Sequence, residues 1–253
     1  MNIPEALFTG KNNIYFQQID STNTYAMDMI SKTNPPEGTC VRTDYQTAGK
    51  GQIGRYWQSE TGKNVLISYI FYPHCIKATD QFYLNIMSGL AVRNTLSHWI
   101  PEVKIKWPND IYAGNKKIAG ILVQNVLRGT QIKTTVIGIG INVNQILFPV
   151  DIPNPTSVAI ETGKFADLEK IILWLSAGLE HQYFLLKKHS FDIMKMDYLN
   201  HLYRLNEWTT FCTDTTGDFI ARITGIDAQG KLLLQLENET TVSFGFRELT
   251  FKM

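Results

Sequence analysis

The sequence has 253 residues, of which 44% are hydrophobic and 19% charged, and its formal net charge is +1. This length favours one large domain, or a large domain with a small one, and the apolar fraction suffices for a real core and argues against a disordered chain. The near-neutral charge argues against a protein that binds nucleic acid mainly by neutralising phosphates.

The N-terminal segment, the apolar runs and the cysteines further limit the classes of protein to which the chain can belong. The N-terminal segment has no basic start followed by an apolar stretch, so no secretory signal is predicted. The longest apolar runs, such as residues 136–143, are too short to span about 30 Å of hydrocarbon. The three cysteines are widely spaced and contain no C-x-x-C pair, which excludes the usual zinc knuckles and disfavours a disulfide framework. We therefore expect a soluble protein of a reducing cytoplasm, with neither a membrane nor a nucleic-acid partner.

Helical and strand patterns follow one another along the first 205 residues. Ser21 is expected to cap a short helix, which Asn34-Pro35-Pro36 ends. Strands are predicted at 39–44, 64–72, 103–107, 117–126 and 133–142, and helices at 80–100, 166–188 and 191–205. From Trp208 the pattern changes to short β runs at 208–212, 219–226, 231–237 and 241–246. The sequence predicts an α+β fold with two domains, a mixed domain over 1–204 and a small β-barrel over 205–253.

A glycine-rich loop follows the first predicted strand and fits the letters G-x-G-x-x-G from Gly49 to Gly54. A dinucleotide fingerprint also needs a helix that opens at the loop and an acidic residue about 20 positions later. A strand without an acidic residue follows instead, so a Rossmann site is excluded. With Lys50 and Arg55, the loop can still wrap an anion, and an ordinary surface loop remains the alternative.

The segment Lys106-Trp107-Pro108-Asn109-Asp110 closes a predicted strand and leads into a tight turn near Gly114. Strand alternation across this turn places Asp110 and Lys117 on one face, opposite or diagonal to each other. A solvated surface ion pair is the plain alternative. Further along, Gly138 and Gly140 interrupt an apolar strand, which indicates either close approach of a ligand or crowded sheet packing.

Taken together and in order, these segments resemble the biotin protein ligases. The residues that carry the resemblance are Ser21-Thr22-Asn23, residues 46–57, Lys106 to Asp110, Lys117-Ile118-Ala119-Gly120-Ile121-Leu122, and Gly138 to Asn142. The resemblance runs from about residue 15 to the C-terminus. It implies a catalytic domain related to class II aminoacyl-tRNA synthetases over 1–204, followed by an SH3-like barrel over 205–253.

The resemblance also implies a two-step reaction that uses ATP, biotin and Mg²⁺. Biotin's carboxylate attacks the α-phosphorus of ATP to give biotinyl-5′-adenylate and pyrophosphate, and a lysine of a biotin carboxyl carrier protein then attacks the mixed anhydride. The implied catalytic residues are Lys117, Arg55 and Asp110, with Asp110 also the metal ligand or the group that orients the acceptor lysine. The implied biotin-binding residues are Ser21, Thr22, Asn23, Gln46, Gly49, Lys50, Gly51, Gln52, Lys117, Gly120, Ile121, Leu122, Gly138 and Gly140. The implied ATP-binding residues are Lys50, Arg55, Trp57, Lys106, Asn109 and Asn142.

Two departures from the family pattern bear on these expectations. The family's loop often reads G-R-G-R, whereas this chain has Lys50 and Gln52, so bidentate phosphate contacts are lost and a looser hold on the adenylate is expected. Only 20 residues precede Ser21, too few for the N-terminal DNA-binding domain of some relatives. Family members often pair through the central sheet, so a homodimer is expected from the resemblance alone.

Two other functions compete with this interpretation. A lipoate- or octanoate-protein ligase has a similar fold and chemistry, but the R-R-x-x-G-G-G-type motif of those enzymes is missing from the sequence. A non-catalytic biotin-binding module is the second alternative, and the presence of Lys117, Asp110 and Arg55 argues against it.

Overall fold

A computed structural model describes residues 5–51 and 56–252. A seven-stranded sheet forms its centre, with the strand order β1-β2-β3-β7-β6-β5-β4. Its strands are β1 (Asn13–Ile19), β2 (Cys40–Gln46), β3 (Val65–Phe71), β4 (Val103–Lys106), β5 (Asp110–Ala113), β6 (Lys116–Arg128) and β7 (Gln131–Ile141). The pair β1–β2 is parallel and the other neighbours are antiparallel, so the sheet is mixed, as predicted.

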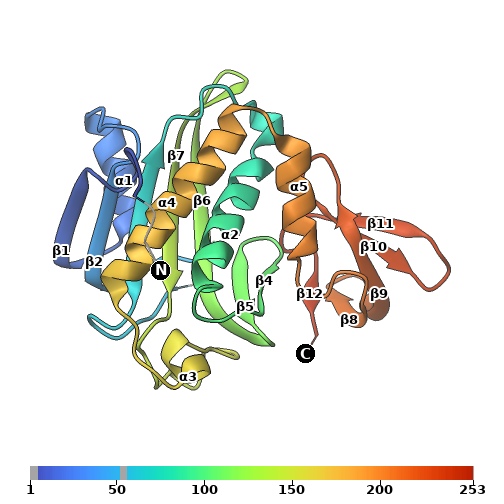
Figure 1. The fold of residues 1–253 in the computed structure, drawn as a ribbon. Helices are drawn as coiled ribbons and strands as arrows, with labels where there is room; N and C mark the ends of the chain where they lie inside the picture. Colours follow the sequence, from blue (N-terminus) through green and yellow to red (C-terminus); the bar gives the residue numbers. More distant parts are fainter. Residues whose placement is uncertain (1–4, 52–55, 253) are drawn as a thin grey trace.

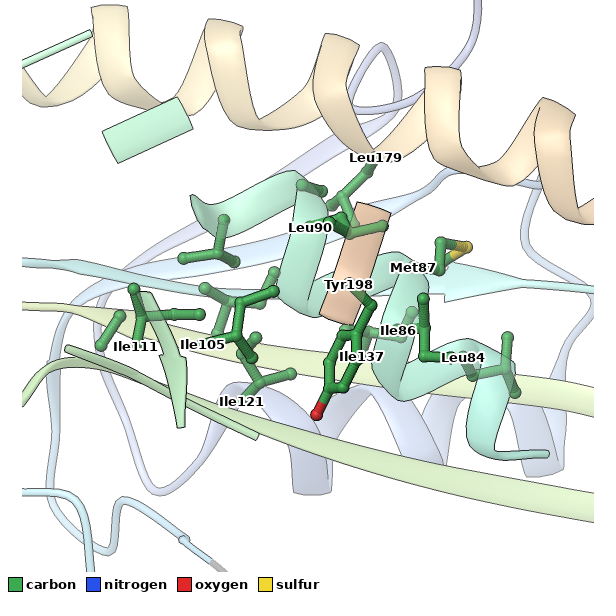
Figure 2. Packing of buried hydrophobic residues seen from close by; sticks show 14 of the residues in the cluster. Leu84, Ile86, Met87, Leu90, Ile105, Ile111, Ile121, Ile137, Leu179 and Tyr198 are labelled. Carbon is green, nitrogen blue, oxygen red and sulfur yellow. The ribbon is translucent and has the colours of Figure 1, made fainter. Parts of the chain in front are cut away.

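Helices cover the two faces of this sheet unequally (Figure 1). The helices of the described chain are α1 (Thr22–Lys32), α2 (Phe82–Leu96), α3 (Val158–Thr162), α4 (Leu168–Lys187) and α5 (Phe191–Asn200), with a short 3-10 turn at Ala78–Asp80. One face carries α2 and, over it, α4 and α5, and this side holds the large apolar core that Figure 2 shows around Leu90, Ile105 and Ile137. The other face carries α1, whose Ala26 packs with Val41, Ile70 and Val136 in a much smaller cluster.

A second, antiparallel sheet follows α5 and lies beside β4 and β5 (Figure 1). Its strands are β8 (Trp208–Thr213), β9 (Gly217–Ile226), β10 (Leu232–Leu236), β11 (Thr241–Phe244) and β12 (Thr250–Phe251). Their order is β11-β10-β9-β8-β12. The change of pattern predicted near residue 205 thus coincides with the start of this sheet. None of the helices in the described ranges combines the length and the apolar character needed to cross a bilayer.

Most differences between the predicted and the observed elements are strands and helices that the sequence did not predict. The predicted helix over 191–205 ends at Asn200, because the chain then runs beside β4, where the Ile105 N–H donates to the His201 carbonyl. Strands β1, β5 and β12 and helix α3 were not predicted. The Trp107–Pro108 peptide bond, between β4 and β5, is cis.

Candidate functional site

Strand alternation turns the glycines of the central sheet toward α1. On β7, Ile137 and Ile139 point into the large core, so Gly138 and Gly140 lie on the opposite face. The register aligns Gly138 with Ser68 of β3 and Leu122 of β6, and aligns Gly140 with Leu66 and Gly120. We call this face, which carries Ser68, Leu66, Gly120, Leu122, Gln124, Gly138 and Gly140, the site face. Its centre lacks side chains, so other groups can approach the backbone closely.

A buried polar cluster occupies one end of the site face, where α1 begins. The Ser68 hydroxyl lies 2.8 Å from the Thr22 hydroxyl and donates to the Asn23 side-chain oxygen at 2.9 Å. The Asn23 amide nitrogen donates to Gln124 at 2.7 Å. A Cβ at Gly138 would lie 2.5 Å from Asn23 Oδ1, so the glycine makes room for this side chain.

The first residue of the S-T-N motif has a structural role. The Ser21 hydroxyl accepts a hydrogen bond from the Thr24 N–H at 3.4 Å and caps α1, as its sequence context predicted. Gln46, at the end of β2, accepts a hydrogen bond from the Thr22 N–H at 2.8 Å. Ser21 and Gln46 therefore position the start of the helix that carries Thr22 and Asn23.

The indole of Trp57 lies directly on the glycines at the middle of the site face. A Cβ on Gly140 would lie 2.4 Å from Trp57 Cε2, and one on Gly120 would lie 2.8 Å from Cζ3. The indole nitrogen is buried and has no hydrogen-bond partner among the described residues. Beside the indole, a hollow of about 630 Å³ is lined by Gln46, Gly49 and Trp57 on one side and by residues 145 and 147–149 on the other.

Lys117 and Asp110 meet at the next part of the same face. Lys117 Nζ lies 2.7 Å from Asp110 Oδ1, and both side chains are about one quarter exposed, at 28% and 23%. The ammonium is also 5.8 Å from the Trp57 ring centre. The expected common face is confirmed, and the pairing is diagonal, because Lys117 aligns with Tyr112 and Asp110 aligns with Gly120. A partly shielded cation of this kind is well suited to hold carboxylate and phosphate oxygens together.

The backbone around Lys117 is held by the segment after β7. The Lys117 N–H donates to the Asn154 carbonyl at 2.8 Å, and the Thr156 N–H donates to the Lys117 carbonyl at 2.9 Å. Asn142 joins this arrangement, because its amide nitrogen donates to the Thr156 carbonyl at 3.0 Å. Its side-chain oxygen is buried without a hydrogen-bond partner in the described part of the chain. The structure thus brings Asn142 close to the segment that fixes Lys117.

Two residues of the K-W-P-N-D segment lie beside Asp110. Asn109 is buried, its carbonyl accepts a hydrogen bond from the Ile121 N–H at 3.0 Å, and its amide nitrogen donates to the Ile121 carbonyl. Lys106 aligns with Asp110 across β4 and β5, and its ammonium lies 3.0 Å from the Tyr112 hydroxyl. These contacts anchor the segment on which Asp110 lies.

The structure corrects the prediction that the side chain of Ile121 forms a wall of the site. Ile121 is 3% exposed and its side chain packs in the large core (Figure 2), because β6 turns odd-numbered residues of this stretch away from the site face. Only its backbone borders the site.

Part of the glycine loop lies outside the described residues. Gly49 and Gly51 are described, and Lys50 is exposed and forms an isolated bridge with Tyr56. The predictions for Gln52 and Arg55 concern positions outside the described residues.

The described side chains around Asp110 include few ligands for a magnesium ion. Within residues 5–51 and 56–252, no group of three or more His, Cys, Asp or Glu side chains is placed to hold a metal. Mg²⁺ commonly binds through one or two carboxylates together with substrate phosphates and water. Asp110, beside Lys117, is a carboxylate that fits such a role, and the side-chain amide of Asn109 is directed to Ile121 instead.

Two contributors to the site were missed in the sequence. Ser68 is a fully buried hydroxyl in the otherwise apolar stretch of β3, and this lone polar residue was the available signal. Gln124 lies on the site face of β6 and holds Asn23. Its importance depends on pairing between distant strands, for which the local pattern gave no signal.

Known proteins share this fold and these segments. The family model described as "Biotin/lipoate A/B protein ligase family" matches residues 15–142. A bifunctional ligase/repressor BirA of Bacillus subtilis is 34% identical over 234 residues, which cover 89% of this chain and 70% of the relative. A biotin–[acetyl-CoA-carboxylase] ligase of Mycobacterium tuberculosis is 26% identical, with coverage of 89% and 84%. The solved biotin protein ligase of Aquifex aeolicus, in complex with biotin and ATP, superposes with a TM-score of 0.79 at 26% identity, with coverage of 96% and 99%. The chain belongs to the biotin/lipoate A/B protein ligase family.

Proposed function

We propose that this chain is a biotin protein ligase, which activates biotin with ATP and transfers it to a lysine of a biotin carboxyl carrier protein. The observation that carries the proposal is the site face itself. A buried polar cluster at Thr22, Asn23 and Ser68 and a lysine paired with Asp110 lie at its two ends. The similar chain of known structure was solved with biotin and ATP.

Biotin's polar ureido group requires donors and acceptors, whereas the rest of the molecule is largely apolar. Thr22, Asn23 and Ser68 supply hydroxyl and amide groups, and Gln124 and Gln46 hold two of them in place. Gly138, Gly140 and Leu122 lie between this cluster and Lys117, with the Trp57 indole resting on Gly140. This arrangement orients the biotin carboxylate toward Lys117.

The first step joins two anions, so fixed positive charge at the junction lowers its barrier. Lys117 contacts the biotin carboxylate and the α-phosphate, and Asp110 and the Asn154 and Thr156 backbone contacts hold Lys117. A carboxylate oxygen forms a bond to the α-phosphorus as pyrophosphate leaves. Lys50, Lys106 and Arg55 are assigned to the phosphates, and Trp57 and Asn142 to the adenine. Asp110 would hold Mg²⁺ together with the phosphates, and the ion would supply positive charge to offset that of the pyrophosphate.

In the second step the neutral amine of the acceptor lysine attacks the carbonyl carbon of the adenylate. The amide bond forms, AMP leaves with the electrons of the broken C–O bond, and the amine loses a proton to solvent. Closure of the site against water favours this attack over hydrolysis. Once pyrophosphate has left, Asp110 orients the incoming amine.

The proposal includes the two domains, the location and the partners of the chain. Residues 1–204 form the catalytic domain, of the class II aminoacyl-tRNA synthetase type, and residues 205–253 form an SH3-like domain. Three unpaired cysteines support a reducing, cytoplasmic location. The partners are the carrier domain and a second copy of this chain, and no nucleic acid is required by the chemistry.

Biotin-dependent exchange between ATP and pyrophosphate tests the proposal directly. We expect exchange with biotin in the presence of Mg²⁺, and none with lipoate or octanoate. Exchange with lipoate or octanoate alone would assign the chain to the other branch of the family. Biotin binding without exchange would leave a non-catalytic binding module.

A further inference from the structure

The second sheet contacts the K-W-P-N-D segment through a buried tryptophan. Trp107 is 4% exposed, and its indole nitrogen donates to the Gly230 carbonyl at 2.9 Å. Its ring centre lies 5.3 Å from that of Phe246. Gly230 and Phe246 both follow residue 205, so they belong to the β8–β12 part of the chain (Figure 1). The hydrogen bond therefore joins the β4–β5 hairpin, which carries Asp110, to the second sheet.

The turn that supplies the acceptor has internal hydrogen bonds and packs closely against α2. Residues 227–230, between β9 and β10, form what we call the 227–230 turn. The Asp227 carboxylate accepts hydrogen bonds from the N–H groups of Gln229 at 2.8 Å and Lys231 at 2.9 Å. Gly230 has a φ of +82°, and a Cβ there would lie 2.0 Å from Phe82 Cγ of α2. A glycine is required at this position, because the turn lies directly against α2.

The held tryptophan is close in sequence to the proposed catalytic pair. Asn109 is fixed to Ile121 through both its backbone and its side chain. Trp107 is fixed to Gly230, so the second sheet and β6 anchor the chain on either side of Pro108. Asp110 comes next and pairs with Lys117. Lys106, which directly precedes Trp107, aligns with Asp110 across β4 and β5, so the place of Trp107 bears on the place of the carboxylate that pairs with Lys117.

We propose that Trp107 and the 227–230 turn are positioning residues for adenylation: they set the place of Asp110 and, through it, of Lys117. This inference rests on the proposed function of that ion pair. The turn touches neither substrate, and its effect passes through Trp107. The biotin cluster at Thr22, Asn23 and Ser68 lies on the site face near α1, away from this contact, so biotin binding does not depend on the turn.

The chain offers a matched control for the turn. Asn238 lies in the exposed turn between β10 and β11, where its side-chain oxygen accepts a hydrogen bond from the Thr240 N–H at 3.1 Å. Asp227→Ala and Asn238→Ala each remove a turn-stabilising acceptor from the same sheet. Asp227→Asn keeps an oxygen acceptor in place. Trp107→Phe keeps an aromatic ring beside Phe246 and removes the N–H donor.

The experiment measures kcat and KM for biotin-dependent exchange, the Kd of biotin by calorimetry and the melting temperature of each variant. Asp227→Ala and Trp107→Phe are expected to lower kcat about three- to tenfold, the effect of one hydrogen bond expressed in the barrier. The Kd of biotin stays within about twofold, as for a contact remote from the ligand. Asp227→Asn restores kcat, and Asn238→Ala behaves as the unaltered chain.

Equal kcat values for Asp227→Ala and Asn238→Ala would overturn the inference. So would a loss of biotin affinity that parallels the loss of kcat, since this would indicate general loosening. If Asp227→Ala does not fold, Trp107→Phe decides, and an unchanged kcat in that variant refutes the positioning role. Absence of exchange in the unaltered chain would instead contradict the proposed function itself.

Discussion

The indole ring of Trp57 rests on the backbone of β7 at Gly140, where a Cβ atom would lie 2.4 Å from Trp57 Cε2. No ordinary Cβ contact is this short, so the ring and any larger residue at position 140 exclude each other. The glycines that were predicted to admit a ligand thus admit a side chain of the protein itself. Trp57 is thereby held between the buried polar cluster at Thr22, Asn23 and Ser68 and Lys117, 5.8 Å from the lysine ammonium.

Gly140→Ala is therefore expected to displace Trp57 and to weaken ATP binding. If Trp57 stacks on the adenine, loss of that contact raises the KM for ATP about tenfold, since base–aromatic stacking contributes roughly 1–3 kcal/mol. The KM in the exchange assay and the tryptophan fluorescence of the free protein measure the two effects. Gly178→Ala in α4 is the matched control, because its Cβ would meet the nearest atom at an ordinary 3.5 Å. An unchanged KM with a shifted fluorescence spectrum would remove Trp57 from the nucleotide site.

Lys116 and Lys117 are neighbours at the start of β6, so variants of the two can distinguish a catalytic role of Lys117 from an effect of surface charge. Lys117→Met removes the cation at the junction of the two anions, and kcat for exchange is expected to fall about 100- to 1,000-fold. Its neighbour Lys116 is exposed and its ammonium lies 3.8 Å from Glu161, so Lys116→Met removes the same charge one residue away. We expect the control to retain activity within about twofold. Similar losses in both variants would indicate that only the local positive potential matters.

Local patterns sufficed for several parts of the site. Alternation across a short turn correctly placed Asp110 and Lys117 on one face, because strand geometry fixes side-chain direction. The cap formed by Ser21 was predictable for a similar reason, since it involves only Thr24 three residues later. Both features depend on residues that are close in the chain.

Other features of the site were missed or misplaced. Ile121 was assigned to a wall of the site together with Gly120 and Leu122, although alternation along β6 turns it to the opposite face and into the core. Ser68 and Gln124 join the site only because β3 and β6 both neighbour β7. Strand β5 has four residues and follows directly after Pro108 and Asn109, too short for a clear periodic pattern. The places of Ser68 and Gln124 follow from sheet order, which no local window contains.

The Glu180 carboxylate predicts a pH dependence of stability. It is buried and accepts hydrogen bonds from the N–H groups of Leu7 at 2.7 Å, Phe8 at 2.9 Å and Thr9 at 3.0 Å. Burial by itself raises the pKa of Glu180, but these three backbone donors outweigh it and the pKa is lowered. A native pKa below that of the unfolded chain stabilises the fold above the ordinary glutamate pKa of about 4.3, and this stabilisation is lost as the pH falls through the native value.

Glu180→Gln should therefore lower the free energy of unfolding at pH 7 by about 1–3 kcal/mol, and by progressively less at an acid pH below the ordinary glutamate pKa of about 4.3. Urea denaturation at both pH values measures the difference. Glu237→Gln, at an exposed turn of the second sheet, is the control and should have little effect at either pH. A loss of stability that is the same at both pH values would contradict the role of the ionised carboxylate.

Phe251, in the last strand of the second sheet, is expected to contribute to ATP binding through its contact with Lys106. The ammonium of Lys106 lies 4.9 Å from the ring centre of Phe251 and 4.6 Å from that of Tyr112. Phe251→Leu removes one of these aromatic faces, and a cation–π contact contributes about 0.5–1 kcal/mol at a partly exposed site. We expect the KM for ATP to rise about two- to fivefold with kcat little changed, and Phe251→Tyr to restore it.

A second cation–π pair in the same sheet provides the control for Phe251. The Arg222 guanidinium lies 5.3 Å from the ring centre of Trp208, which is half exposed. Trp208→Leu therefore removes the same kind of contact without reaching Lys106, and the KM for ATP should not change. Equal increases in KM for Phe251→Leu and Trp208→Leu would mean that both variants merely loosen the sheet. An increase confined to Phe251→Leu and reversed by tyrosine would mean that the aromatic face orients the Lys106 ammonium toward the phosphates.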